Sequence, residues 1–264
     1  MLENYSSLKP LYFGRPEQKD LWFVWLADHK HTINSDGSID IHERVEVSRH
    51  TCKEVYKSLF PLTVLPFKFN VVQGDFIAHS NELESLVNFP KRVEGKLHMP
   101  CVGPLTDLEG CPEYVGGDFS FYRETGLVKD LVGGPKYIGG DVYVQGGNIA
   151  SLEGCPEVIY GKLDAGYSQL KTLEGSPKIV HGDLKVHYTQ IKSLEGSPKT
   201  VGGDFACGFN SDIISLKGAP LEIKGEFRGN NFSDADYRKY VKKIALVDNA
   251  LSKDFDIKAL EDFE

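Results

Sequence analysis

A short phrase recurs through most of this chain, and it restricts the possible fold more than any other feature. Eight copies occur, centred on a glycine: VVQGDF, RVEGKL, YVGGDF, YIGGDV, VIYGKL, IVHGDL, TVGGDF and EIKGEF. We call this residue the anchor glycine, and the set is Gly74, Gly95, Gly117, Gly140, Gly161, Gly182, Gly203 and Gly225. Successive anchor glycines are 21 to 23 residues apart. That length is too short for a domain but sufficient for one coil of a solenoid.

Apolar residues stand at fixed distances from each anchor glycine. Leu lies nine residues before it in all eight copies, Val or Ile lies two before it, and an apolar residue lies two after it. A single coil cannot bury these side chains, whereas stacked coils bury them in a continuous core. The residues after the glycine alternate as in a short strand, with Leu184 and Val186 pointing inward. The LEG-x-P-K stretch favours turns and forms the return path. We predict a mainly β, right-handed repeat solenoid of about eight coils, with a parallel sheet on one face.

Two resemblances follow from these motifs. LKVHYTQIKSL, from Leu184 to Leu194, resembles the leucine-rich repeat pattern L-x-L-x-x-N-x-L-x-x-L. The asparagine position of that pattern holds Asn81, Gly103, Gly126, Gly147, Ser168, Thr189 and Ser211. The phrase SLEGxPKxVGGDF is similar to tandem-repeat proteins of T4-like tailed bacteriophages, over roughly residues 32–232. These resemblances imply a leucine-rich-repeat-like fold, and a phage-encoded protein that acts on a host protein.

The sequence outside the repeats predicts caps for both ends of the solenoid. We divide the chain into an N-terminal helical cap (1–31), a leading hairpin and incomplete coil with an insertion (32–61), the solenoid (62–231), and a C-terminal helical cap with an acidic tail (232–264). The apolar run at 21–26 predicts a helix that covers the first coil. Ser233 and Asp236 predict the start of a second helix near 234–246, and Tyr237 lies on the face that would close the last coil.

Composition excludes several classes of function. The chain has 30 Lys and Arg against 38 Asp and Glu, a net charge of −8, which disfavours direct binding of nucleic acid through a basic surface. No apolar run is long enough to span a bilayer, and no secretory signal is visible. Five cysteines without paired spacing fit a reducing cytoplasm. We therefore expect a cytoplasmic protein that does not bind membranes.

Catalytic and metal-binding motifs are also missing, so we expect no enzyme activity, no cofactor and no metal. A partial calcium-loop pattern at 34–43 is better explained as a hairpin turn. Cys111 and Cys155 occupy a repeat position that takes small residues, which indicates a structural role. Cys101 is the candidate if the protein has a catalytic thiol. An enzyme would need a site in the N-terminal region, where acidic and histidine residues cluster. These are His29, His31, Asp36, Asp40, His42 and Glu43.

The outward positions of the predicted strands carry aromatic and basic residues of the types that dominate protein interfaces. The predicted protein-binding residues are His98, Tyr122, Arg123, Tyr143, Tyr167, Lys185, His187, Tyr188, Phe209 and Arg228. A row of mostly acidic residues directly follows the anchor glycines. Its members Asp75, Asp118, Asp141, Asp183, Asp204 and Glu226 form either an electronegative stripe or a set of turn residues that accept backbone hydrogen bonds.

Four functions remain open at this point. The first is a non-enzymatic module that binds and inhibits or redirects a host protein through the strand face. The second is an acidic mimic of nucleic acid that blocks a DNA- or RNA-binding enzyme. An enzyme and a self-assembling structural protein are the other two. The oligomeric state does not follow from the sequence.

Overall fold

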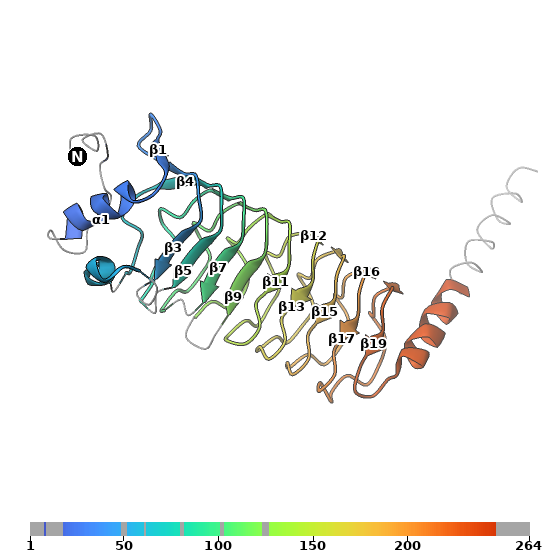
Figure 1. Ribbon diagram of the computed structural model, residues 1–264. Helices are drawn as coiled ribbons and strands as arrows, with labels where there is room; N and C mark the ends of the chain where they lie inside the picture. The colour runs from blue at the N-terminus through green and yellow to red at the C-terminus, as the bar shows by residue number, and fades with distance from the viewer. Residues whose placement is uncertain are drawn as a thin grey trace, which may run out of the picture.

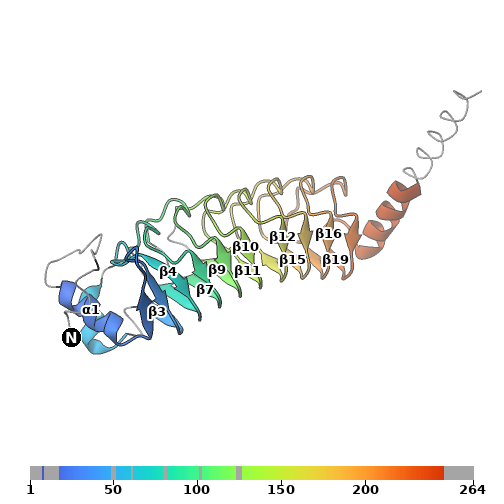
Figure 2. The same cartoon turned by 90° about the horizontal axis from the view of Figure 1, so that it is seen from above.

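The body of the molecule is a parallel β-solenoid of about seven turns, close to the eight coils predicted. The computed structural model describes residue 8 and residues 18–48, 52–60, 62–79, 82–100, 103–122 and 127–246. The coils stack into an elongated rod with a helix near each end (Figures 1 and 2). The predicted mainly β solenoid is therefore confirmed.

The strands that follow the anchor glycines form the predicted sheet. It is nine-stranded, and every pair of neighbours in it is parallel. In spatial order its strands are β3 (Val45–Ser48), β5 (Phe76–His79), β7 (Leu97–Pro100), β9 (Phe119–Tyr122), β11 (Val142–Tyr143), β13 (Leu163–Asp164), β15 (Leu184–Lys185), β17 (Phe205–Ala206) and β19 (Phe227–Arg228). We call this the first sheet. The strand β3 extends it by one and lies in the predicted incomplete coil of residues 32–61.

A second row of strands precedes the anchor glycines, and the sequence analysis did not predict it. The hairpin β1 (His31–Ile33) and β2 (Ile39–Ile41) begins a six-stranded sheet, and a four-stranded sheet follows. The members of the row are β4 (Phe69–Val72), β6 (Arg92–Val93), β8 (Tyr114–Val115), β10 (Tyr137–Ile138), β12 (Val158–Ile159), β14 (Ile179–Val180), β16 (Thr200–Val201) and β18 (Glu222–Ile223). Each coil therefore contributes one strand on either side of its glycine. The Val or Ile two residues before that glycine is buried in this second row.

The anchor glycine is required because neighbouring coils approach too closely for a side chain. Its N–H donates to the carbonyl of the preceding anchor glycine, as from Gly203 to Gly182 at 2.9 Å. A Cβ added to Gly203 would lie 2.2 Å from the Oδ1 of Asp183. The glycine of the LEG phrase has a different role. Gly110 has φ +90°, and the N–H of Cys111 donates to the carbonyl of Leu108 at 2.9 Å, which defines a type II turn.

The leucines nine residues before the anchor glycines are the centre of the core. Leu108, Leu152 and Leu194 are fully buried and belong to one cluster that runs through the coils. This is the stacked environment that the repeat predicts.

The N-terminal end of the solenoid is covered by the predicted helix, α1 (Gln18–Ala27). Trp22 and Trp25 are buried and meet Phe67 and Phe69 edge to face. The 3₁₀-helix η2 (Glu54–Leu59) occupies the predicted helical insertion. Asp28, just after α1, accepts hydrogen bonds from the hydroxyl of Tyr56 at 2.6 Å and from Lys53 at 2.5 Å. This contact ties η2 to α1.

A helix over residues 234–246 closes the other end. Ser233 and Asp236 form reciprocal capping bonds at its start, as predicted, with Asp236 accepting from the Ser233 N–H at 2.9 Å. Tyr237 is fully buried, stacks on Phe227 and donates its hydroxyl to the carbonyl of Pro220. The predicted acidic tail lies outside the described residues.

Candidate functional site

Three predicted residues form an exposed column of stacked rings at the end of the first-sheet strands. The ring centroids of Tyr167 and Tyr188 are 4.7 Å apart, and those of Tyr188 and Phe209 are 4.1 Å apart, with planes within 14° of parallel. All three side chains are exposed, at 59%, 42% and 62%. We call Tyr167, Tyr188 and Phe209 the aromatic stack. Each is six residues after its anchor glycine, just beyond β13, β15 and β17.

The backbone at the aromatic stack is strained. Tyr167, Tyr188 and Phe209 have φ of +55°, +53° and +60°, a region that residues with a Cβ seldom adopt. The corresponding residue of the preceding coil is Gly146, with φ +75°. Glycine would satisfy this turn without strain in every coil. Three bulky rings therefore occupy a position that the fold itself would give to glycine or asparagine.

Three polar side chains hold the turn beneath the aromatic stack, two of them buried and that of Thr189 half-buried. Ser168, Thr189 and Asn210 each follow a ring of the stack, and each side chain donates to the carbonyl three residues before it, at 2.7 to 3.0 Å. Asn210 is 4% exposed, and its carbonyl oxygen also accepts the N–H of Thr189 at 2.8 Å. The asparagine position of the coil of Gly203 is therefore Asn210, and its assignment to Ser211 was wrong.

His187 lies beside the aromatic stack. Its ring meets Tyr167 and Tyr188 edge to face, with centroids 5.1 and 5.8 Å away. A Cβ added to Gly166 would lie 3.0 Å from the His187 ring, so the glycine makes room for it. The structure thus gathers four of the predicted binding residues into one exposed cluster.

The other predicted residues lie apart from this cluster. His98 and Tyr143 are on the outer face of the first sheet, where a shallow pocket of about 380 Å³ is lined by Asp75, Lys96, His98, Asp118, Ser120 and Tyr143 among others. His98 contacts the hydroxyl of Ser120 through Nδ1. Burial lowers the pKa of His98, and the neighbouring His79 adds to the effect. Tyr122 belongs to β9, and Arg123 lies outside the described residues.

The acidic row is a hydrogen-bonding ladder. In five places the Oδ1 of an aspartate accepts the backbone N–H of the equivalent residue in the next coil, at 2.9 to 3.0 Å. The acceptors are Asp75, Asp118, Asp141, Asp183 and Asp204. The row therefore consists of turn residues whose carboxylates accept backbone hydrogen bonds, one of the two predicted alternatives. The same ladder explains the close approach at the anchor glycines.

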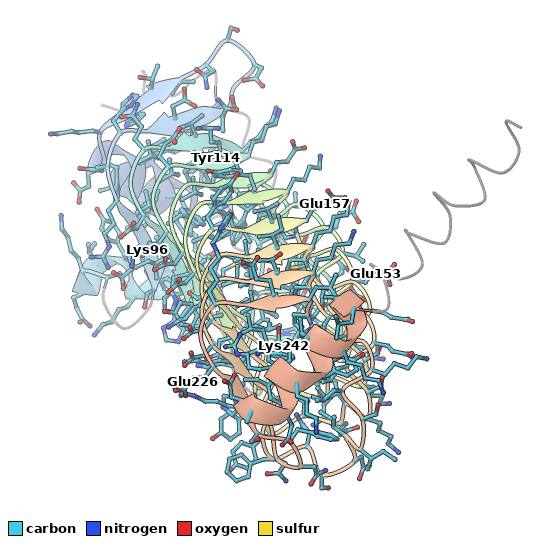
Figure 3. The ribbon with its side chains drawn as sticks, turned by 90° about the vertical axis from the view of Figure 1, so that its right-hand side faces the viewer. Lys96, Tyr114, Glu153, Glu157, Glu226 and Lys242 are labelled. Carbon is cyan, nitrogen blue, oxygen red and sulfur yellow. The ribbon has the colours of Figure 1, made fainter. Side chains whose placement is uncertain are left out.

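Cations neutralise most of the acidic row. Lys96 pairs with Asp118 at 2.7 Å, and the hydrogen bond from Lys96 lowers the pKa of that carboxyl in spite of its partial burial. The pairs Lys162–Asp141 and Lys185–Asp183 are wider, at 3.7 and 3.9 Å. Arg228 contacts both Asp204 and Glu226. The predicted binding residues Lys185 and Arg228 are therefore engaged within this row. Figure 3 shows Lys96 and Glu226 along one flank of the molecule and Glu157 along the other.

A second column of rings lies along the second row of strands, and sequence reasoning missed it. The guanidinium of Arg92 lies 3.5 Å from the centre of the Tyr114 ring, which stacks on Tyr137 at 4.7 Å with planes 2° apart. Tyr160 and His181 continue the column. The ring centroid of Tyr160 lies 5.5 Å from that of Tyr137 and 5.7 Å from that of His181. We call these five residues the second column, and Figure 3 places Tyr114 beside the second-row strands. The sequence signal for it is that the ring lies three residues before the anchor glycine in two coils and directly before it in the next two.

The N-terminal cluster of acidic and histidine residues lies in and around the β1–β2 hairpin. Asp40 accepts hydrogen bonds from Asn34, Asn70 and the N–H of Val71, and His42 contacts Thr32. Within the part of the chain that the structure describes, no group of three His, Cys, Asp or Glu residues could hold a metal ion. Burial raises the pKa of Cys155 and Cys207 to about 12. Cys101 lies outside the described residues.

No family model matches the chain, and neither the curated proteins nor the solved structures include a significant match. Among the described residues, no helix has the length and apolar character needed to cross a bilayer.

Proposed function

We propose that this protein is a non-enzymatic protein-interaction module whose contact surface is the aromatic stack with His187. The observation that carries the proposal is the combination of exposure and strain at Tyr167, Tyr188 and Phe209. Strained non-glycine backbone is retained where it serves a function, and exposed apolar patches mark interaction sites.

Stability alone is a poor explanation for the stack. Offset or parallel ring pairs contribute about 0.5–1.5 kcal/mol beyond burial. The left-handed backbone costs about 1–2 kcal/mol for each residue with a Cβ. The two ring pairs therefore contribute about 1–3 kcal/mol, against a backbone cost of about 3–6 kcal/mol for the three residues, so the stack does not stabilise the fold. Tyr and Phe side chains that are rigid and already ordered lose little entropy on binding a partner, which suits them to an interface.

The proposed partner is a protein of a bacterial host, which the protein would inhibit or redirect. This part of the proposal rests on the resemblance of the repeat phrase to phage tandem-repeat proteins. The acidic-mimic alternative has less support, since the carboxylates of the acidic row accept backbone bonds and face cations. A mimic needs unpaired negative charge at its surface.

An affinity capture from bacterial lysate tests the proposal. The variant Tyr167→Asn, Tyr188→Asn, Phe209→Asn removes the rings and keeps a residue that tolerates positive φ. The control variant Ile214→Asn, Leu221→Asn removes two exposed apolar side chains elsewhere. We expect one protein to be captured by the wild type and the control and lost with the triple variant. Equal capture by all three would reject the stack as the contact surface.

A further inference from the structure

We propose that the second row of strands is the interface of a symmetric dimer, formed with a second copy of this chain. The face carries the second column of rings and a row of alternating charges. The proposal does not depend on the function of the aromatic stack, because the two surfaces lie on different strands.

The second column is built from two different repeat positions. In the coils of Gly117 and Gly140 the ring comes from three residues before the glycine, as Tyr114 and Tyr137, and glycine stands directly before the anchor. In the next two coils the ring comes from the residue directly before the anchor, as Tyr160 and His181. Val158 and Ile179 then occupy the other position. If strands simply favoured aromatic residues at one position, all four rings would occupy that position, so the exchange needs another cause.

Three of the four rings of this column are exposed, and Tyr114 is half-buried. Tyr137 and Tyr160 are 38% and 51% exposed, and they are the central pair of the column. A contiguous run of half-exposed rings on a sheet is an apolar surface of the kind that marks an interface.

Charges beside the column alternate in sign from coil to coil. Four residues before successive anchor glycines stand Glu113, Lys136, Glu157 and Lys178. Within the chain they pair as Lys136–Glu113 at 3.4 Å and Lys178–Glu157 at 2.6 Å. All four side chains remain 63 to 76% exposed, so they can also contact another molecule.

This order of charges makes the face complementary to itself. A two-fold axis makes the contacts of a dimer interface reciprocal, so that when one residue faces a second residue of the other copy, that second residue faces the first in return. If the axis passes between β10 and β12, Lys136 faces Glu157 of the other copy and Glu113 faces Lys178. The same axis sets Tyr137 against Tyr160 and Tyr114 against His181. Opposite charges meet at all four positions, and rings meet rings.

Sedimentation equilibrium or light scattering tests the dimer directly. We expect the mass of the wild type to rise with concentration from 29.4 kDa to twice that value. Lys136→Glu sets like charges against each other twice in the dimer, and we expect it to weaken dimerisation about tenfold or more. Lys199→Glu changes the same repeat position outside the matched four, where the same axis sets it opposite Lys91 of the other copy, and we expect dimerisation as tight as that of the wild type or tighter.

The decisive variant is the charge swap Lys136→Glu, Glu157→Lys. It restores opposite charges across the two-fold axis but places like charges next to each other within one chain. We expect the swap to recover dimerisation to within a few fold of the wild type, with the fold verified by circular dichroism. A wild type that stays monomeric at every concentration, or a swap that dimerises no better than Lys136→Glu, would overturn the proposal.

Discussion

The carboxylate of Asp183 accepts a hydrogen bond from the backbone N–H of Asp204 at 2.9 Å, and these two residues occupy the same position in successive coils. The bond joins one coil to the next outside the sheet ladders. Its geometry accounts for two features of the repeat at once. Aspartate follows the anchor glycine because its side chain reaches the next coil, and the glycine is needed because that carboxylate lies against it.

Removing the carboxylate of Asp183 should destabilise the solenoid. Asp183→Ala leaves the N–H of Asp204 without its acceptor, and we expect the free energy of unfolding to fall by about 1 kcal/mol. Asp183→Asn keeps an acceptor oxygen and should cost less than half as much. Urea denaturation followed by circular dichroism measures both. An Asp183→Ala variant as stable as the wild type would show that the ladder contributes nothing.

The anchor glycine should not tolerate a methyl group. Gly203→Ala places a Cβ against the carboxylate and backbone of Asp183, and we expect a loss of at least about 1–3 kcal/mol. Gly208→Ala is the matched control, since the nearest atom to its Cβ would be the carbonyl oxygen of Arg228 at 3.7 Å. Thermal unfolding should separate the two variants clearly. Equal melting temperatures would contradict the close approach between coils.

The N-terminal cap should be sensitive to acid. The hydrogen bonds from Lys53 and Tyr56 hold the pKa of Asp28 below its ordinary value of 3.8, and burial together with Asp28 raises the pKa of Tyr56 to about 12. Because the pKa of Asp28 is lower in the folded than in the unfolded protein, Asp28 contributes to the free energy of unfolding above its unfolded pKa. This contribution is lost as the pH falls through the folded pKa.

The two tryptophans of the chain, Trp22 and Trp25, both lie in α1 and report on the cap. We expect Asp28→Asn to lower the denaturant midpoint of tryptophan fluorescence at pH 7, and to reduce its dependence on pH below about 4. Circular dichroism of the solenoid should change less. A fluorescence midpoint with the same pH dependence in both proteins would exclude this role for Asp28.

The aromatic stack should be dispensable for folding. Phe209→Asn loses a stacking contact but relieves the cost of positive φ, so we expect the free energy of unfolding to change by less than about 1 kcal/mol. Asn210→Ala, in the next position, removes a buried side chain that makes several hydrogen bonds, and should cost about 2 kcal/mol or more. Urea midpoints compare the two. A larger loss from Phe209→Asn would give the ring a structural role.

The core and the strand after each anchor glycine were predictable from sequence. Residues such as Leu108 and Val115 recur at fixed distances from the glycine, and a solenoid core depends on just such periodicity. After the anchor glycine two inward apolar residues, such as Leu184 and Val186, show the alternation of a strand. The second row was not predicted because each of its two-residue strands, such as Tyr114–Val115, offers only one inward residue before the glycine, and one residue shows no alternation.

The candidate site was predicted in part, because only side chains at the same repeat position can be recognised from the sequence as neighbours in successive coils. Tyr167 and Tyr188 share one repeat position, so aligned copies of the repeat bring them together. Tyr137 and Tyr160 occupy different repeat positions, so an alignment of the repeats places them in different columns although their rings are in contact in the structure. The coil of Asn210 is one residue longer than the coil before it, so the residue five before its repeat leucine, Leu216, is Ser211 and not Asn210.

Photo-crosslinking is the most direct test of the aromatic stack as the contact surface. The photoreactive residue p-benzoylphenylalanine is placed at position 209, and in a second protein at position 214. Ile214 is 81% exposed, more than Phe209, but lies outside the stack. We expect irradiation in bacterial lysate to give one covalent adduct from position 209 and none from position 214. An adduct of the same protein from both positions, or from position 214 alone, would contradict the account.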